Sequence, residues 1–195
     1  MWQGLPWDDG VLMRTWDDIW YKHAKDVDWN NTSPKQASWD KKGVKMIRAY
    51  KAQAANATEY PFLFEKKFVT EATDTLPSMH GIIDKFWRDE QGVAVIDYKT
   101  GRNAPDPLIL DRDPQFTMYY AGAKKILGIE VNRFAIHHLQ SGKLYWTTRT
   151  QDDLEELADA FKEAQAKVDQ EMFARNVAWT CNFCDFRQVC LKKMV

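Results

Sequence analysis

The chain has 195 residues, of which 45% are hydrophobic and 13% aromatic, enough apolar material for one folded domain with a sizeable core. Because 27 Lys and Arg residues balance 28 Asp and Glu residues, the composition excludes a protein that binds nucleic acid through one global basic field. No apolar run approaches the roughly 18 residues of a membrane span, and the N-terminal segment lacks the pattern of a signal peptide. We therefore expect a cytoplasmic protein.

The first half of the chain combines two helical patterns with three strand-like segments. Apolar residues recur at helical spacing over residues 9–25, and after a polar loop a second helix is expected over 38–55. Three strand-like segments follow, at 62–69, 80–88 and 93–101. The last two are separated by the turn-forming sequence Asp-Glu-Gln-Gly, which predicts a small antiparallel meander.

The second half predicts a capped helix, two more strands and a long acidic helix. Asp113 can cap a helix that begins with Pro114, and Gly128 is suited to end it. The remaining elements are strands at 133–140 and 143–150, joined by Ser141-Gly142, and a helix over 151–175. This order of elements indicates an α/β or α+β arrangement of helices around a sheet.

The chain has no internal repeat, no low-complexity segment and no composition shift typical of a linker. We therefore expect a single domain over residues 1–195. It would consist of an N-terminal helix and loop (1–35), a catalytic core (36–175) and a cysteine-containing tail (176–195).

Two aspartates on neighbouring strands are the first candidate catalytic residues. Asp84 and Asp97 lie on either side of the predicted hairpin turn, so the two carboxylates can approach each other across the ladder. Facing carboxylates repel and raise each other's pKa unless a cation lies between them, and Mg²⁺ is a hard ion that prefers carboxylate oxygens and water. Lys99, on the same strand face as Asp97, can orient an attacking water and offset charge in a phosphoryl transition state.

The capped helix adds two polar side chains to this set. Gln115 and Tyr119 lie four residues apart and therefore on one helix face. Gln115 lies in the first turn, where free N–H groups and the helix dipole favour a phosphate, so the pair could hold a DNA strand end. A single Asp-x-Lys at a strand end fits a surface ion pair as well, but the ordered set of Asp84, the hairpin turn, Asp97 with Lys99, and the helix with Gln115 and Tyr119 favours a catalytic site.

The segments HGIIDKF, VAVIDYKTG and QFTMY resemble the signature of the RecB-like branch of the PD-(D/E)XK nuclease superfamily. The resemblance covers roughly residues 36–190. It implies an α/β, restriction-endonuclease-like core with a central mixed β-sheet flanked by helices, and cleavage of DNA with Mg²⁺ or Mn²⁺. The roles it implies are metal ligands at Asp84, Asp97 and the backbone carbonyl of Tyr98, a catalytic lysine at Lys99, and DNA contacts at Gln115 and Tyr119.

Glu65, in the first predicted strand, matches an acidic catalytic position found in many members of that branch. A structural ion pair with a neighbouring lysine is an equally good interpretation, because a Glu among lysines on an exposed strand face commonly forms one. Both interpretations stay open from the sequence.

All three cysteines of the chain lie in the tail, at Cys181, Cys184 and Cys190. Three thiolates so close together favour a metal or an iron–sulfur cluster, and three unrelated reduced thiols are the alternative. RecB-like nucleases that resemble the Cas-type exonucleases have this triplet and take a fourth cysteine from the N-terminal region, which implies a 4Fe–4S cluster here. Because this sequence has no fourth cysteine, we expect an N-terminally truncated chain, with a divergent three-cysteine or histidine-completed site as the alternative.

Together these features predict a metal-dependent DNA nuclease. We expect an exonuclease acting on single strands or DNA ends in recombination, repair or phage replication, with a helicase or recombinase partner and no membrane contact. One alternative is a non-catalytic DNA-binding module of a helicase–nuclease complex. The other is a small zinc-stabilised interaction domain, for which only the cysteine tail argues.

Overall fold

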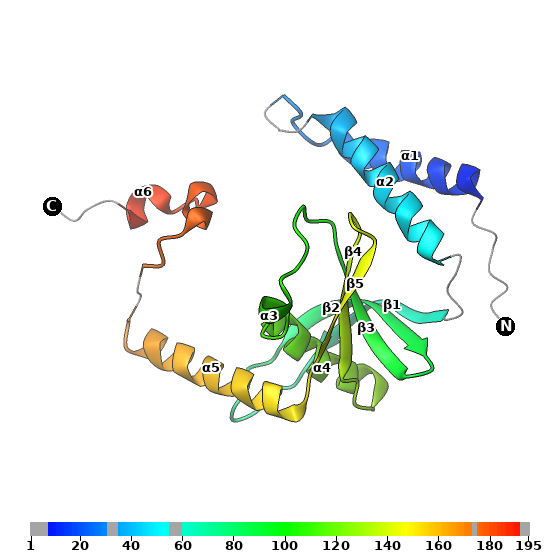
Figure 1. Cartoon of the computed structure of the whole chain (residues 1–195). Coiled ribbons are helices and arrows are strands. Elements are labelled where there is room, and N and C mark those ends of the chain that lie inside the picture. The colour runs from blue at the N-terminus through cyan, green and yellow to red at the C-terminus, as the bar shows by residue number, and fades with distance from the viewer. Residues whose placement is uncertain (1–7, 31–34, 55–59, 173–174, 192–195) are drawn as a thin grey trace.

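The computed structural model describes residues 8–30, 35–54, 60–172 and 175–191, which form one five-stranded sheet with helices around it (Figure 1). The strands are β1 (Tyr60–Val69), β2 (His80–Asp89), β3 (Gly92–Lys99), β4 (Arg133–His138) and β5 (Lys143–Thr148). The helices are α1 (Asp9–Ala24), α2 (Gln36–Ala54), α3 (Pro107–Leu110), α4 (Pro114–Leu127), α5 (Gln151–Asp169) and α6 (Arg187–Cys190), with a 3₁₀ turn η1 (Trp179–Phe183).

The sheet is mixed, with the strand order β1-β2-β3-β4-β5. β1, β2 and β3 form the predicted antiparallel meander, β3 and β4 run parallel, and β4 and β5 are antiparallel. A parallel pair needs a crossover connection, which α3 and α4 provide here. The prediction of an α/β fold with a central mixed sheet flanked by helices is confirmed.

The helix α4 begins and ends as its sequence predicts. The Asp113 side chain accepts a hydrogen bond from the backbone N–H of Gln115 at 2.9 Å, Pro114 occupies the first helical position, and Gly128 ends the helix with a φ of 69°. Such a left-handed conformation favours glycine because it has no Cβ. α4 packs against β1 and β2, and α5 packs against α4.

The core lies between the sheet and α4. Its largest members are Phe68, Ile83, Phe86, Val95, Phe116, Tyr120, Val131 and Phe134. A Cβ added at Gly122 would lie 2.6 Å from the Phe68 ring, so this glycine allows α4 to approach β1 closely. The core thus fixes α4, and with it the first turn of that helix, against the strands.

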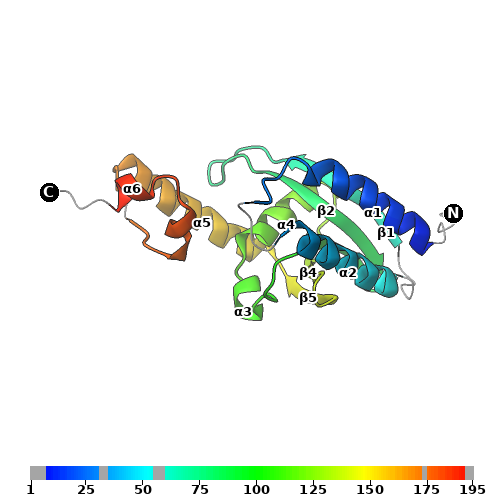
Figure 2. The same cartoon turned by 90° about the horizontal axis from the view of Figure 1, so that it is seen from above.

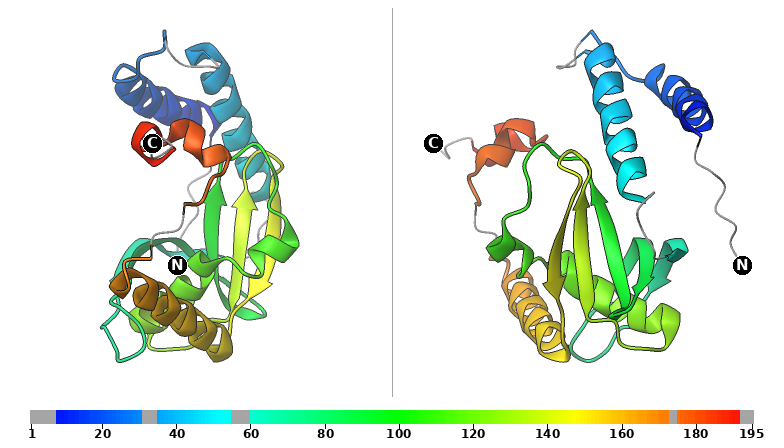
Figure 3. Two further views of the ribbon diagram at one scale, coloured as in Figure 1. Left: turned by 90° about the vertical axis from the view of Figure 1, so that its left-hand side faces the viewer. Right: turned by 45° about the vertical axis from the view of Figure 1, so that its right-hand side comes forward.

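The helices α1 and α2 lie side by side, on the far side of the sheet from α5 (Figures 2 and 3). Trp16 Nε1 of α1 donates a hydrogen bond to Asp40 Oδ1 of α2 at 2.8 Å. Both helices were predicted, with ends within two residues of the observed ones. No helix in the described ranges combines the length and the apolar composition needed to cross a membrane.

The structure departs from the sequence prediction toward the C-terminus. The predicted helix over 151–175 ends at Asp169, and Glu171 has a φ of 56°, which is incompatible with its continuation. The short elements α3, η1 and α6 were not predicted, because four or five residues are too few to display a hydrophobic period.

Candidate active site

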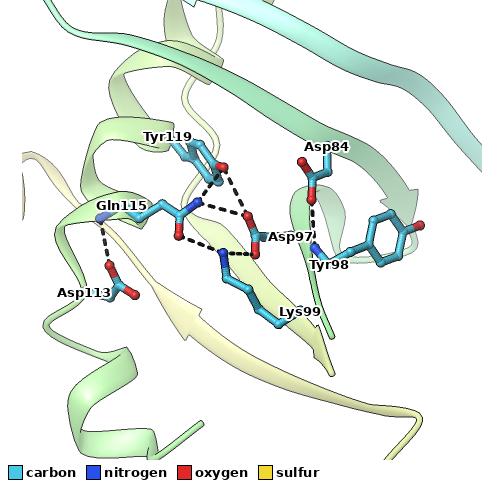
Figure 4. A network of polar contacts seen from close by, with 7 residues as sticks. All are labelled: Asp84, Asp97, Tyr98, Lys99, Asp113, Gln115 and Tyr119. Atoms are coloured by element: carbon cyan, nitrogen blue, oxygen red, sulfur yellow. Dashed lines mark hydrogen bonds and ion pairs between the residues drawn. The ribbon is translucent and has the colours of Figure 1, made fainter. Parts of the chain in front are cut away.

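The site is built where β2 and β3 separate. The two strands pair from their turn as far as Lys85 and Ile96, and the ladder ends there, at a point that we call the fork. Asp84, the next residue of β2, lies at the fork, and its Oδ2 accepts a hydrogen bond from the backbone N–H of Tyr98 at 2.9 Å (Figure 4). The fork thus brings Asp84 next to the segment of β3 that carries Asp97.

Strand alternation places the charged end of β3 against α4. Val95 belongs to the core, and Asp97 and Lys99 follow it on the same face, which we call the front face. Asp97 is 2% exposed. Its Oδ1 accepts hydrogen bonds from Gln115 Nε2 at 3.0 Å and from Tyr119 Oη at 3.1 Å.

Lys99 completes the network on the front face. Its Nζ lies 2.8 Å from Asp97 Oδ2 and donates a hydrogen bond to Gln115 Oε1 at 3.1 Å. The Gln115 Nε2 also lies 2.7 Å from Tyr119 Oη, so the amide is held in one orientation, with oxygen toward the lysine and nitrogen toward the aspartate (Figure 4). Asp97, Lys99, Gln115 and Tyr119 therefore form one connected cluster.

The surroundings of Asp97 disfavour its charged form, and a bound cation would compensate for this. Burial raises the pKa of the Asp97 carboxyl, the Lys99 ammonium opposes this increase, and the negative charge of Asp84 adds to it. The net result is a pKa above the ordinary value. A positive ion between Asp84 and Asp97 would remove the repulsion and compensate the burial.

The two predicted DNA contacts, Gln115 and Tyr119, face Asp97 in this structure. The Tyr119 side chain is 6% exposed, and burial, followed by the charge of Asp97, raises the pKa of its hydroxyl, which therefore stays a donor. Their observed contacts orient the aspartate and the lysine. Contact with DNA stays a prediction for both residues.

Glu65 is in register with Asp84, because its neighbours Phe64 and Lys66 pair with Lys85 and Ile83. The side chain is exposed, and the residue has a φ of 47°, an uncommon backbone conformation for glutamate. Among the described residues, none forms a hydrogen bond or an ion pair with the Glu65 side chain, so the structural ion pair is not formed. Glu65 lies beside the fork without joining the network on the front face.

The sequence did not reveal two groups that hold the surroundings of the site. His138 Nε2 lies 2.9 Å from the Gly101 carbonyl oxygen and fixes the loop after Lys99. Arg149, which is 1% exposed, donates to the carbonyls of Leu110 and Asp113 at 2.8 and 3.2 Å and so supports the start of α4. Both residues lie far from the site in sequence, and no local pattern marks them.

The three cysteines lie apart from the fork, in the segment that extends beyond α5 (Figure 1). Cys184 and Cys190 are exposed, and the Cys181 thiol lies 3.8 Å from the Asn176 carbonyl oxygen. In the part of the chain that the structure describes, no three His, Cys, Asp or Glu side chains converge as metal ligands do. The iron–sulfur cluster stays a prediction.

The residues at the fork fit a hard divalent ion. Asp84 and Asp97 supply carboxylate oxygens, and Asp97 Oδ2, apart from its ion pair with Lys99, accepts no hydrogen bond from the described residues. Mg²⁺ sites in proteins typically use one or two carboxylates and keep several waters, so two carboxylates are sufficient. The donor chemistry therefore suits Mg²⁺ or Mn²⁺.

Comparison with known proteins identifies the family. The family model described as the PD-(D/E)XK nuclease superfamily matches residues 7–191, a span that contains the fork and the whole front-face cluster. No curated protein matches the chain. The chain belongs to the PD-(D/E)XK nuclease superfamily.

Proposed function

We propose that the protein is a Mg²⁺- or Mn²⁺-dependent deoxyribonuclease of the RecB-like branch, acting as an exonuclease on single strands or DNA ends. Membership of a nuclease superfamily implies hydrolysis of phosphodiester bonds and DNA as the substrate. The observation that carries the proposal is the connected network of Asp97, Lys99 and Gln115 at the fork beside Asp84. A strand end without a catalytic role has no need of a buried aspartate with three polar partners.

Each residue of the network has a chemical task in this proposal. A divalent ion, when bound, supplies Lewis acidity and an activated water. Asp84 and Asp97 would hold it, and the backbone carbonyl of Tyr98 is a further proposed ligand. Lys99 is partly exposed, so its ammonium can reach a water or a phosphate oxygen and offset developing negative charge.

The charge distribution near the fork supports a polyanionic substrate. Net charge is only −1, so any attraction to DNA must be local. Exposed Lys66 and Lys67 follow Glu65 on β1, the residue that is in register with Asp84. Exposed Arg102 lies in the loop that follows Lys99. These cations provide phosphate contacts without a global basic surface.

The finer parts of the proposal derive from the sequence signature. They are the preference for strand ends, a role in recombination, repair or phage replication, a helicase or recombinase partner, and a 4Fe–4S cluster on Cys181, Cys184 and Cys190 whose fourth ligand lies outside this triplet. Thiolates are the usual ligands of such clusters. Iron and acid-labile sulfide in the purified protein would support the cluster, whereas zinc alone would favour a small zinc-stabilised domain.

The test of function is cleavage of end-labelled DNA. Linear single strands, linear duplexes and circular single strands are incubated with Mg²⁺, with Mn²⁺ or with a chelator. We expect metal-dependent release of short products from linear DNA and little attack on circles. Binding of DNA without cleavage under any metal condition would contradict the proposal and favour a non-catalytic DNA-binding module.

A further inference from the structure

Behind the fork, on the face of β3 opposite to Asp97, lies a second cluster, which we call the rear cluster: Tyr50, Lys85, Tyr98 and His137. Its members come from α2, β2, β3 and β4. The Tyr98 ring is at its centre, with ring centroids 5.7 Å from both Tyr50 and His137 and with Lys85 Nζ 5.3 Å above its face. None of its four side chains has a part in the proposed catalysis.

The rear cluster and the front-face network are joined through the backbone. Lys85 follows Asp84 directly, and Tyr98 lies between Asp97 and Lys99. The fork is therefore bridged twice, in front by the hydrogen bond from Tyr98 N–H to Asp84 and behind by the contact of Lys85 with the Tyr98 ring. A displacement of the Tyr98 ring would move the peptide that sets the spacing of Asp84 and Asp97.

The Tyr98 side chain borders open space on one side. Tyr50 and Tyr98 both line an apolar hollow of about 460 Å³ between α1, α2 and the ends of β3 and β4, so each phenol has free space on one side. The hydroxyl groups of the two tyrosines lie 3.0 Å apart. This hydrogen bond joins α2 to the strand that carries the site, and it adds to the contacts with Lys85 and His137 that hold the ring.

We propose that Tyr50 is a positioning residue for the metal site, acting through Tyr98 on the separation of Asp84 and Asp97. The inference rests on the proposed function, since it assumes that these two carboxylates hold the ion. Loss of the Tyr50 hydroxyl leaves the half-buried Tyr98 hydroxyl without its partner, which favours movement of the ring into the hollow. Residues that orient metal ligands typically change metal affinity about 10- to 100-fold when they are removed.

The test is Mn²⁺ binding to the full chain, measured by isothermal titration calorimetry without DNA. We expect Tyr50→Phe to bind Mn²⁺ about tenfold more weakly than the wild type. The Mn²⁺ concentration for half-maximal DNA cleavage should increase by the same factor, with the cleavage rate at saturating Mn²⁺ retained. Tyr21→Phe, at an exposed tyrosine of α1, is the matched control and should leave both values unchanged.

Tyr98→Phe removes the same hydrogen bond from its other side and should weaken Mn²⁺ binding equally. Because both changes break one bond, the double variant should be no weaker than either single variant. This second variant keeps the inference testable if Tyr50→Phe folds poorly.

A Tyr50→Phe protein that melts at a lower temperature but binds Mn²⁺ as the wild type does would overturn the inference, since Tyr50 would then only hold α2. A wild-type protein that binds no Mn²⁺ would overturn the inference and the proposed function together. A wild type that binds Mn²⁺ but cuts no DNA would contradict the proposed function alone, and a tenfold loss in Tyr50→Phe would still support the inference.

Discussion

The front and rear faces of β3 differ in how they compensate buried charge. On the front face, the buried carboxylate of Asp97 has a lysine, an amide and a phenol as partners. On the rear face, Lys85 is 3% exposed and has no carboxylate partner among the described residues; instead its Nζ lies 4.3 Å from the Trp87 ring centroid and 5.3 Å from that of Tyr98. The front face thus pairs its buried anion with a cation, whereas the rear face holds a buried cation without a carboxylate partner, at a cost in stability.

The pKa values reflect the same difference. Burial lowers the pKa of Lys85 to about 8 and that of His137 to about 4. His137 Nε2 has no hydrogen-bond partner in the described part of the chain, and its ring is neutral at pH 7. Burial disfavours charge on the rear face as it does at Asp97, but only Asp97 has a charged partner, Lys99, that opposes the effect. Three substitutions test this difference between the two faces.

The largest effect is expected for Asp97→Asn on the front face. Loss of the carboxylate should reduce cleavage at least about 1,000-fold, because the ion contributes several kcal/mol to transition-state stabilisation. Since burial raises the pKa of Asp97, its charge is costly in the folded protein, and the variant should melt at the same or a higher temperature. Cleavage rates and thermal melts measure both quantities, with the exposed Asp26→Asn as control. A folded variant that cleaves DNA as fast as the wild type would contradict a catalytic role for Asp97.

The second effect concerns Lys99→Met. The rate of cleavage should fall about 100-fold, as is typical when a side chain that positions or transfers a proton in the transition state is removed. Because Lys99 lowers the pKa of Asp97, its loss raises that pKa, and the acid-side midpoint of Mn²⁺ binding should move to higher pH. Binding titrations between pH 5 and 8 test this, and Lys22→Met, an exposed change on α1, is the control. An unchanged midpoint would show that the ion pair does not influence Asp97.

The smallest effect is expected on the rear face, where Lys85→Met should stabilise the protein. The pKa of Lys85 falls from 10.5 to about 8 on folding, so protonated Lys85 disfavours the folded state at neutral pH. At roughly 1.4 kcal/mol per unit, and allowing for lost cation–π contacts, the gain should be about 1 to 3 kcal/mol at pH 7. It should shrink as the pH rises from 8 to 10.5, where both states become neutral. Urea unfolding at pH 7 and 10 measures it, and destabilisation at pH 7 would contradict the account.

The front face was predictable because its signals are local. Strand alternation puts Asp97 and Lys99 on one face, the turn after β2 brings Asp84 beside them, and Asp113 with Pro114 begins the helix that carries Gln115. Strand alternation, the turn and the start of the helix each depend on residues within a few positions of one another, so each can be recognised in the sequence.

The rear face was not predictable, because its properties arise from packing between distant segments. Nothing near Lys85 in sequence shows that Tyr50 and His137 will cover it, since they come from α2 and β4. The same holds for Arg149. Its partners Leu110 and Asp113 lie in the crossover from β3 to β4, and the fold brings them next to Arg149. A single sequence carries no mark of such contacts.

The central claim is that Asp84 and Asp97 hold the ion that DNA cleavage requires. Its most direct test is a titration of Mn²⁺ into the wild type and into the double variant Asp84→Asn, Asp97→Asn, with cleavage followed at each Mn²⁺ concentration. We expect wild-type binding and cleavage to follow one curve, and we expect the double variant to be folded and to show neither. A double variant that binds Mn²⁺ and cuts DNA as the wild type does would contradict the claim.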